Sequence, residues 1–487
     1  MVVIPRKVKE IVKKLKDNKF EAYLVGGCVR DFLRGVEPKD WDITTNAKPE
    51  EIRKIFPNSF YENKFLTVTV QTGNNNPNVQ EVEITTYRKE AKYSDKRHPD
   101  EVKFAESLEE DLSRRDFTIN AMALDITNKK ERKVIDFFGG EKDLKQKIVR
   151  AVGNPEERFS EDALRMMRAV RFAVILGFKI EGKTAQAIKN NSFWLKMVSK
   201  ERIRDEFLKI IMSERAAQGV ELLRILGLLR YIIPEIEEGY GVSQNKHHIY
   251  DVYEHSLKSL DYAAKQGFNQ DVRLAALLHD IGKPRVKQGE GPEATFYNHE
   301  IVGAKMTFQI LSRLKFPKKD IKKITKLVRY HLFYYNVGEV GESSVRRLIR
   351  RVGLENMDDL LHLRMADRIG SGVPKAEPYK LRHLRYLIEK LSRDPLSVKM
   401  LKVNGEDVMR ILNIKPGPRV GMVLDILLSY VVNDPKKNKK EVLEGEIEKL
   451  AWLSDEELKQ KAEKARQEIE EIETKRDQMT KKKYWVT

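Results

Sequence analysis

The spacing of apolar residues changes near residue 155, and this change leaves few architectures open to the chain. From 20 to 150, short β-rich runs such as AYLVGG, WDITT, TVTVQT and KVIDFF alternate with helical segments such as KPEEIRKIF. Beyond about 155, apolar residues recur at intervals of three and four with little strand pattern. We therefore expect an α+β fold in which a small mixed-sheet head precedes an all-helical remainder.

Breaks in the helical part divide it further. A chain of 487 residues exceeds what one core usually supports and predicts about three domains. Breaks are predicted by GSGVPKAEP at 370–378 and NDPKKNKK at 433–440. Residues 441–480 are charged, with Leu and Ile at helical spacing, and predict a helical hairpin or coiled coil. We expect four parts in chain order: a head (1–145), a neck (146–220), a body (221–372) and a tail (373–487).

The charge balance points to a polyanionic partner. Lysine and arginine number 92 against 74 acidic residues, a net charge of +18, and nucleic acid is the leading candidate. The single cysteine, Cys28, fits a reducing compartment, so we expect the cytoplasm. No apolar run reaches the length of about 18 residues that a membrane span needs, so we expect no membrane association.

A strand-to-helix turn and a nearby pair of carboxylates predict a phosphate site. Gly26 and Gly27 let backbone N–H groups approach a triphosphate closely. Residues two apart on a strand share a face, so Asp40 and Asp42 should point together while Trp41 enters a core. Taken alone, this carboxylate pair is more often a solvated strand end than a site.

Two carboxylates held this close require a cation. Magnesium prefers oxygen ligands, and two ions bridging carboxylates and a triphosphate suit phosphoryl or nucleotidyl transfer. Glu81 and Glu83 share one strand face, and Glu83 is our candidate third carboxylate. We interpret Glu81 as an exposed residue.

Four ordered motifs resemble the class II tRNA nucleotidyltransferases, the CCA-adding family of the polymerase-β-like superfamily. They are GGCVRD, KDWDITT, RRDFTINAMALD at 114–125 and EDALRMMRAVRF at 161–172. The resemblance continues through IDFFGGEKDL, SKERIRDEFLKI and VNGEDVMRILNIKPGP. It implies template-independent, Mg-dependent addition of CCA to tRNA from CTP and ATP.

The resemblance also implies a role for individual residues. Asp40 and Asp42 would hold Mg, and one of them or Glu83 would assist deprotonation of the attacking hydroxyl. The nucleotide-binding residues would be Gly26, Gly27, Arg30, Arg114, Arg115, Asp116, Asn120, Asp162, Arg165 and Arg168. Of these, the four from 114 to 120 match the family's ribose-recognition motif.

Base selection is expected at Asp162 and Arg165. Three residues apart, they should be neighbours on one helix face. The resemblance implies that this pair accepts cytosine and adenine, which present an amine beside a ring acceptor, and rejects uracil and guanine. Without the resemblance, such a pair is usually a surface salt bridge. Arg168 would support the site or contact phosphate.

A polar segment at 88–111, rich in both charges, predicts a mobile loop. The family associates a flexible element here with switching from C to A addition, so its presence favours full CCA addition. Enzymes that add only the terminal A also retain the motifs, so an A-adding enzyme stays an alternative, as does a poly(A) polymerase. A protein-modifying nucleotidyltransferase and a non-catalytic RNA-binding protein are further alternatives, which the motifs oppose.

Histidines predict a second metal site. Six of the nine lie between His247 and His331, and an ordered H…HD…D pattern resembles the HD phosphohydrolase superfamily. Lone histidines on apolar helices are usually core residues, but an ordered set indicates metal binding. A transition metal (Mn, Fe, Co, Ni or Zn) suits such ligands, and we expect a phosphohydrolase activity on RNA ends. The candidate ligands are His255, His279, Asp280, His299, His331 and Asp367.

Basic helical segments in the second half of the chain are candidates for phosphate contacts. They include RLKFPKKDIKKITKLVRYH at 313–331 and RRLIRRVG at 346–353. Together with the motifs, they lead us to expect tRNA, CTP and ATP as partners, and they leave the oligomeric state open.

Overall fold

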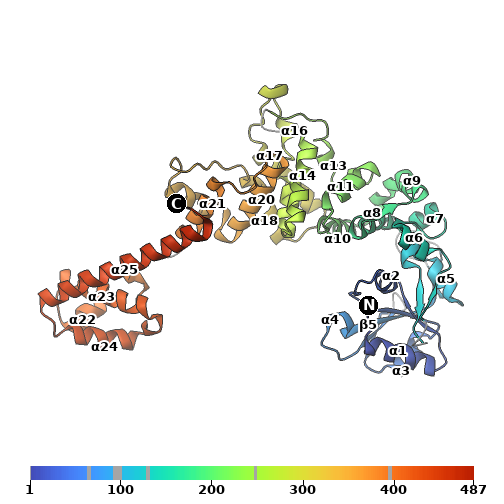
Figure 1. The fold of residues 1–487 in the computed structure, drawn as a ribbon, viewed down its shortest axis with the longest axis horizontal. Helices are drawn as coiled ribbons and strands as arrows, with labels where there is room; N and C mark the ends of the chain where they lie inside the picture. The colour runs from blue at the N-terminus through green and yellow to red at the C-terminus, as the bar shows by residue number, and fades with distance from the viewer. Residues whose placement is uncertain are drawn as a thin grey trace. The chain divides into compact units, whose positions relative to one another are not determined.

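The computed structural model describes residues 2–62, 67–91, 101–127, 132–245, 249–392 and 397–486. These residues form two compact units, each with a core of its own (Figure 1). Unit 1 comprises Met1–Leu332 and His362–Pro374, and unit 2 comprises Phe333–Leu361 and Lys375–Thr487.

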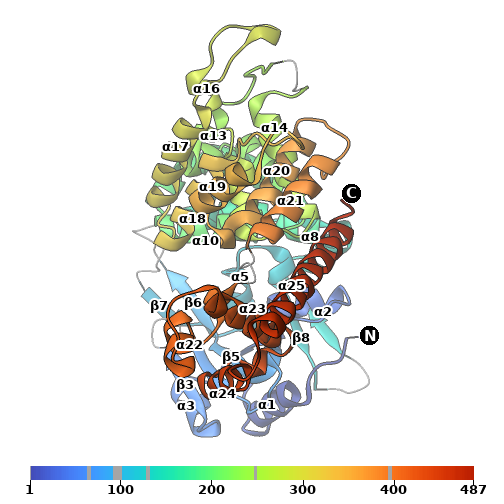
Figure 2. The same cartoon turned by 90° about the vertical axis from the view of Figure 1, so that its left-hand side faces the viewer.

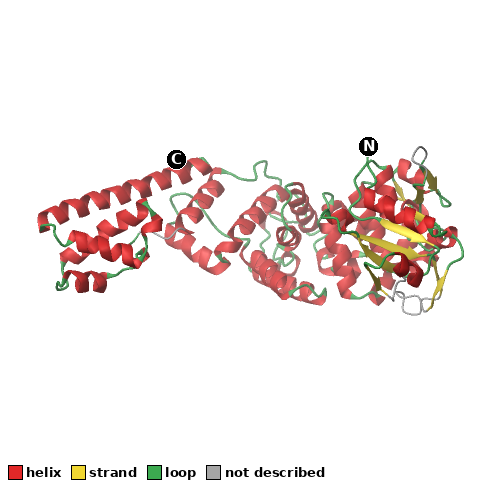
Figure 3. Ribbon diagram, turned by 90° about the horizontal axis from the view of Figure 1, so that it is seen from below, coloured by secondary structure: helices red, strands yellow, loops and turns green. Residues whose placement is uncertain are grey.

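Unit 1 begins with a seven-stranded mixed sheet close to the N-terminus (Figure 3). The β2–β5 pair is parallel and the other neighbouring strands are antiparallel. The expected mixed-sheet head is therefore confirmed. The strands, in the order in which they lie side by side, are β3 (Ser59–Glu62), β4 (Thr67–Gln71), β5 (Glu81–Thr86), β2 (Asp42–Thr45), β1 (Ala22–Val25), β8 (Ala123–Asp125) and β9 (Lys133–Ile135).

Alternating side chains explain why these runs form strands. In β4, Val68 and Val70 enter the core while the intervening residues are only half-buried. Helix α1 joins the same core through an apolar face at helical spacing that includes Val8 and Leu15. The helices of this part are α1 (Arg6–Asp17), α2 (Gly27–Leu33), α3 (Pro49–Ile55), α4 (Pro77–Gln80), α5 (Leu108–Ser113), η1 (Thr118–Asn120) and α6 (Gly140–Gln146).

The segment expected to be a loop from 88 to 111 contains regular structure. Strands β6 (Arg88–Ala91) and β7 (Glu101–Phe104) pair antiparallel, and α5 follows, with its N-terminus capped by Ser107. A two-stranded ribbon is joined by main-chain hydrogen bonds, so a polar composition does not prevent it. Residues 92–100 lie outside the described part, so the predicted mobility of the loop tip stays a prediction.

The rest of unit 1 is helical with one exception. Strand β10 (Ile148–Val149) pairs parallel with β11 (Lys179–Ile180), so the neck is not all-helical as expected. The expected boundaries at 145 and 220 fall inside α6 and α11. The helices here are α7 (Pro155–Glu161), α8 (Leu164–Leu176), α9 (Gly182–Asn191), η2 (Ser192–Met197), α10 (Lys200–Ile211), α11 (Ala216–Ile225), α12 (Leu229–Ile232), α13 (Pro234–Glu237), α14 (Val252–Lys265), α15 (Gln270–Leu278), α16 (Lys283–Val286), η3 (Gly291–Glu293), α17 (His299–Arg313) and α18 (Lys318–Tyr330).

Helix α20 (Met357–Gly370) contributes residues to both units. In unit 2 the long α25 (Asp455–Tyr484) packs against α23 (Pro418–Asn433), burying Leu458, Ala462 and Ala465 at helical spacing (Figure 2). No described helix is both long and apolar enough to cross a membrane. The remaining helices of unit 2 are α19 (Glu342–Val352), η4 (Leu354–Asn356), α21 (Tyr379–Ser392), η5 (Val398–Met400), α22 (Gly405–Leu412), η6 (Pro435–Lys437) and α24 (Lys440–Leu450).

Candidate functional site

The turn between β1 and α2 requires glycine. Gly26 has φ +79° and ψ −134°, a conformation that other residues rarely adopt. A Cβ atom there would lie 2.9 Å from Nη1 of Arg115 and 3.7 Å from Oδ2 of Asp42. A Cβ atom at Gly27 would likewise lie 3.7 Å from Nη2 of Arg30. The turn therefore leaves its backbone beside two cations and a carboxylate.

Asp42 is the first residue of β2, and Asp40 lies before the strand, which corrects the expectation that both are strand residues. Trp41 is 2% exposed and packs in the core, as expected. Across the parallel pair, Asp42 lies in register with Glu83 on β5. Burial and the charge of Asp40 raise the pKa of Asp42 to about 7; Glu83 adds to this rise and Arg115 opposes it.

The carboxylates of Asp40, Asp42 and Glu83 suit a hard cation. Carboxylate oxygens are the ligands that Mg²⁺ prefers, and a cation would offset the repulsion that raises the pKa of Asp42. Asp40, Asp42 and Glu83 do not, however, gather into a cluster of ligand atoms within 4.8 Å, whereas two other groups of described residues do. Asp40 and Glu83 are exposed side chains.

The buried carboxylate of Asp111 holds two arginines, one of which lies beside the Gly26 turn. Asp111 is fully buried and lies 2.9 Å from Nη2 of Arg114 and 3.7 Å from Nη2 of Arg115. Thr44 donates its hydroxyl to Asp111 at 3.1 Å. Burial alone would raise the pKa of Asp111, but the two guanidiniums lower it below its ordinary value. Asp111 therefore stays charged and fixes both arginines.

A second buried carboxylate, Asp116, connects three elements. Arg168 on α8 contacts Asp116 at 2.7 Å, and Asn120 donates its amide to it at 3.2 Å. Arg30 on α2 donates to Oδ1 of Asn120 at 2.7 Å. Against the effect of burial, Arg168 and Arg165 lower the pKa of Asp116. The chain of contacts brings together four of the residues expected to bind the nucleotide.

Asp162 and Arg165 do not lie on one helix, which corrects the expected geometry. Asp162 has extended backbone angles (φ −139°, ψ 104°) between α7 and α8. Its Oδ1 accepts from the N–H of Leu164 at 3.0 Å and its carbonyl oxygen from the N–H of Arg165 at 3.0 Å. Asp favours this capping role, so the helix breaks there.

Different partners hold the two side chains. Arg202 on α10 donates from Nη2 to Oδ2 of Asp162 at 2.7 Å. Arg165 pairs with Glu161 and donates to the carbonyl oxygen of Arg114 at 3.2 Å. The spacing of the sequence motifs does not point to Arg202, because only the packing of α10 against α8 brings it to this turn.

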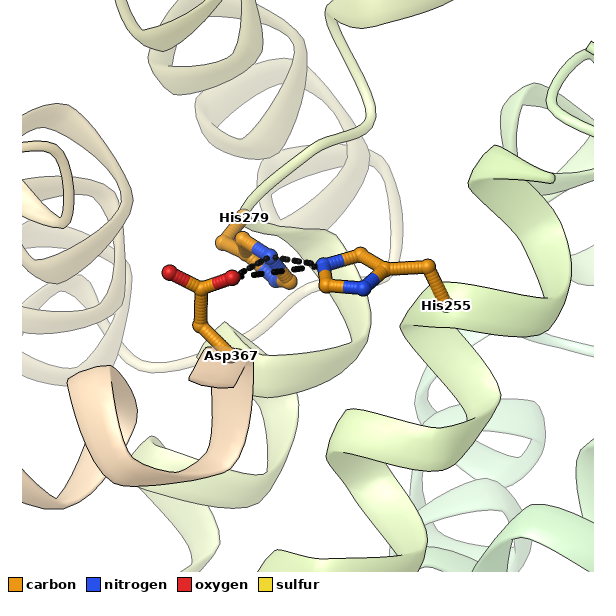
Figure 4. Close-up of side chains that lie close together, drawn as sticks. All are labelled: His255, His279 and Asp367. Atoms are coloured by element: carbon orange, nitrogen blue, oxygen red, sulfur yellow. Dashed lines mark hydrogen bonds and ion pairs between the residues drawn. The ribbon is translucent and has the colours of Figure 1, made fainter. Parts of the chain in front are cut away.

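The first group of side chains that could hold a metal ion lies between three helical elements (Figure 4). Nε2 of His255 on α14 is 2.9 Å from Nε2 of His279, which follows α15. Oδ1 of Asp367 on α20 lies 3.5 Å from His255 and 3.7 Å from His279. The two imidazoles are 0% exposed.

A second group consists of Asp280, His299 and His331. Nε2 of His299 is 3.3 Å from Nε2 of His331, and both approach Oδ1 of Asp280, at 3.4 and 3.6 Å. The other oxygen of Asp280, Oδ2, lies 3.1 Å from His255 and 3.3 Å from His279. One carboxylate thus faces both groups, as a bridging ligand would.

The histidine tautomers suit metal binding. Nδ1 of His279, His299 and His331 lies 2.7 to 2.9 Å from the backbone carbonyl three residues earlier, which assigns the proton to Nδ1 and turns Nε2 toward the cluster.

Burial would lower the pKa of His279, but Asp280 and Asp367 raise it to about 10. The two carboxylates therefore favour positive charge at this point.

A cleft of about 790 Å³ gives access to the cluster and carries cations. Nζ of Lys283 lies 2.7 Å from Asp280 and donates to Gln244 at 2.7 Å. Arg364 contacts Asp367 at 2.7 Å, and Arg368 also lines the cleft. The neighbouring residues 247 and 248, which belong to the histidine cluster of the sequence, lie outside the described part.

Three family models match the chain in succession. The Poly A polymerase head domain covers residues 22–150, the probable RNA and SrmB-binding site of polymerase A covers 177–239, and the HD domain covers 252–369. The nucleotidyltransferase and HD matches imply dependence on divalent metals.

Curated relatives match along most of their length. The CCA-adding enzyme of Ligilactobacillus salivarius is 34% identical over 456 residues, covering 91% of this chain and 96% of the relative. The A-adding tRNA nucleotidyltransferase of Deinococcus radiodurans is 34% identical over 420 residues, covering 83% of this chain and 90% of the relative.

Solved structures share the fold. The CCA-adding enzyme of Bacillus stearothermophilus, solved in complex with CTP, is 30% identical with a TM-score of 0.59 and covers 92% of this chain and 98% of its own. The Thermotoga maritima CCA-adding enzyme complexed with tRNA_CCA is 20% identical with a TM-score of 0.52, covering 92% and 96%.

Metal content tests the second site. We expect purified protein to bind two transition-metal ions per chain, because each group offers three ligands and Asp280 faces both. The variant His299→Ala should lose about one bound ion per chain and should bind the other ion more weakly. Elemental mass spectrometry after dialysis measures the metal content. His383→Ala, which removes a histidine of unit 2 outside both groups, is the matched control. Equal metal content in the wild type and His299→Ala would contradict the assignment.

Proposed function

The chain belongs to the tRNA nucleotidyltransferase family that contains the CCA-adding enzymes, and we propose that the residues around Asp42 carry out its reaction. The enzyme adds C, C and A to the 3′ end of tRNA from CTP and ATP. The observation that carries the residue assignment is the approach of Asp42 and Arg115 to the Gly26 turn, with Glu83 in register with Asp42 on the neighbouring strand. The relatives favour CCA addition over A addition or poly(A) synthesis.

In this reaction the 3′-hydroxyl of tRNA attacks the α-phosphorus of the incoming nucleotide: a P–O bond to the tRNA forms, the bond from the α-phosphorus to the β-phosphate oxygen breaks, and pyrophosphate leaves. Asp40 and Asp42 would hold Mg²⁺, and one of them or Glu83 would assist in removing the proton of the attacking hydroxyl. Bound Mg²⁺ would supply positive charge that lowers the pKa of that hydroxyl and stabilises the departing pyrophosphate. Arg115, fixed by Asp111, adds positive charge at the same turn. The backbone of Gly26 leaves room for phosphate oxygens.

The polar chain through Asp116 suits recognition of the ribose. Asp116 and Asn120 are held by Arg168 and Arg30, so their orientation is set before the nucleotide arrives. Groups ordered in advance lose little entropy on binding. We propose that this network contacts the 2′-hydroxyl and so distinguishes ribonucleotides from deoxyribonucleotides.

Base selection is proposed for Asp162 and Arg165. Asp162 offers acceptors and Arg165 offers donors, the complement of the amine and ring nitrogen of cytosine and adenine. Arg202 holds Asp162, and Glu161 holds Arg165, so each side chain is oriented by a partner of opposite charge. Arg202 is a positioning residue in this account.

Removal of one carboxylate tests the catalytic assignment. Asp40→Ala should lower incorporation of labelled CTP and ATP on the order of 1000-fold or more, because the cation loses a ligand. The Kd for tRNA should stay unchanged. Glu37→Ala, which removes another exposed acid of the same segment, should retain full activity. Turnover at the wild-type rate by Asp40→Ala would refute the role of this carboxylate.

Arg202 provides a test of base selection. Arg202→Met should reduce the preference for CTP over UTP in kcat/KM by about tenfold, equivalent to ~1.4 kcal/mol, while the Kd for tRNA is retained. Arg202→Lys keeps the charge and should recover part of the preference. Arg204→Met, on the same helix, is the control for loss of a guanidinium on α10. An unchanged preference in Arg202→Met would show that Asp162 needs no such support.

We also propose that the HD cluster hydrolyses phosphate esters at RNA ends. The supporting observation is Asp280, whose two oxygens face two separate groups of ligands in a cleft with Lys283 and Arg364. Bound transition metals would supply a hydroxide nucleophile at neutral pH. The cations of the cleft would bind the phosphate oxygens.

Hydrolysis can be separated from nucleotidyl transfer by variants. With added Mn²⁺ or Ni²⁺, the wild type should hydrolyse RNA ending in a 2′,3′-cyclic phosphate or a 2′-phosphate. His299→Ala should lose this activity and keep nucleotide addition, while Asp40→Ala should show the opposite pattern. Absence of hydrolysis by wild type that carries bound metal would remove this proposal and leave the first one intact.

A further inference from the structure

The consecutive helices α17 and α18 form a groove that the reactions above do not use. The helices are joined by residues 314–317 and pack along each other (Figure 2). The groove has a volume of about 770 Å³ and is lined on the α17 side by Ala304, Phe308 and Ser312. The two helices therefore enclose a groove between them, and the surface here is not a flat helix face.

Positive charge follows one wall of this groove. Lys318, Lys322 and Arg329 line it at intervals of four and seven residues, which place them on one face of α18. Lys315 and Lys326 add two more cations. The described lining contains no Asp or Glu, and α18 as a whole carries six basic residues and one acidic residue. Such a strip attracts a chain of phosphates.

An exposed aromatic ring lies among these cations. The side chain of Phe308 is 54% exposed, and Tyr330 lines the groove near Arg329. A single exposed apolar residue is ordinary on a protein surface. Within a cationic groove, however, aromatic faces allow bases or riboses to stack while the cations follow the backbone.

The groove ends near the cleft of the HD cluster. Arg329, which lines the groove, pairs at 3.3 Å with Glu300, which lines the cleft. The residue that follows Tyr330 is His331, a candidate metal ligand. A strand bound along the groove would therefore have one end beside the cluster.

We propose that the α17–α18 groove binds the sugar-phosphate backbone of tRNA. This inference rests on the assignment of tRNA as substrate and adds a binding surface to it. The interior of the groove is mainly apolar, so a base or ribose can lie in it while the cations along its α18 wall contact phosphates. The end of the groove beside the HD cluster, whose proposed substrate is an RNA end, favours RNA over a lipid surface.

Charge reversal in the full-length enzyme tests the groove. Lys318→Glu/Lys322→Glu should weaken tRNA binding at least tenfold at about 100 mM KCl, and should reduce the slope of log Kd against log salt by about 2 over roughly 50–200 mM. Lys9→Glu/Lys13→Glu on α1 has the same spacing, exposure and charge change and should have little effect. Phe308→Ala, which removes no charge, should weaken binding about threefold to tenfold through lost stacking.

Each outcome decides the proposal. Unchanged affinity and slope in the α18 variant, or an equal loss in the α1 control, would overturn it. Retained tRNA binding with lost binding to anionic phosphatidylserine vesicles would also overturn it and assign the groove to membranes. Failure of the wild type to bind tRNA would instead contradict the proposed function. Circular dichroism of each variant excludes unfolding as the cause.

Discussion

The parallel pairing of β2 with β5 is the contact on which the proposed nucleotide site depends. It sets Asp42 in register with Glu83, one residue after the buried Trp41 and beside the Gly26 turn. Burial raises the pKa of Asp42 to about 7, and the negative charges of Asp40 and Glu83 add to the rise. The neighbouring positive charge of Arg115, and a bound cation, are what such an arrangement requires.

Buried charges elsewhere are arranged by the same rule. Asp111 and Asp116 each keep a lowered pKa because arginines face them, and those arginines are in turn held in place. At the HD cluster, Asp280 faces imidazoles on both sides, and Lys283 contacts it at 2.7 Å. In each case the cost of burying a carboxylate is offset by cations. The side chains of both proposed sites are thereby held in place by neighbours of opposite charge.

The sequence predicts the sheet and the side chains that lie together better than it predicts the local geometry. The apolar alternation predicts β4 and β5, and the order of histidines and aspartates points to the two groups of side chains that the structure brings together. The short β3 and the β6–β7 ribbon carry too few apolar residues for such a pattern. The break at Asp162 departs from the expected helix because Asp caps the next turn, a preference that helical spacing alone does not reveal. Arg202 comes from a distant helix, which spacing does not reveal.

The most direct test of the account is incorporation of labelled CTP and ATP, separately and together, into tRNA transcripts that end before CCA, after the first C and after CC. We predict addition to all three in the order C, C, A, with CTP and ATP strongly preferred over UTP and GTP. Acceptance of ATP alone, and only by the transcript ending in CC, would contradict full CCA addition and assign the enzyme to terminal A addition.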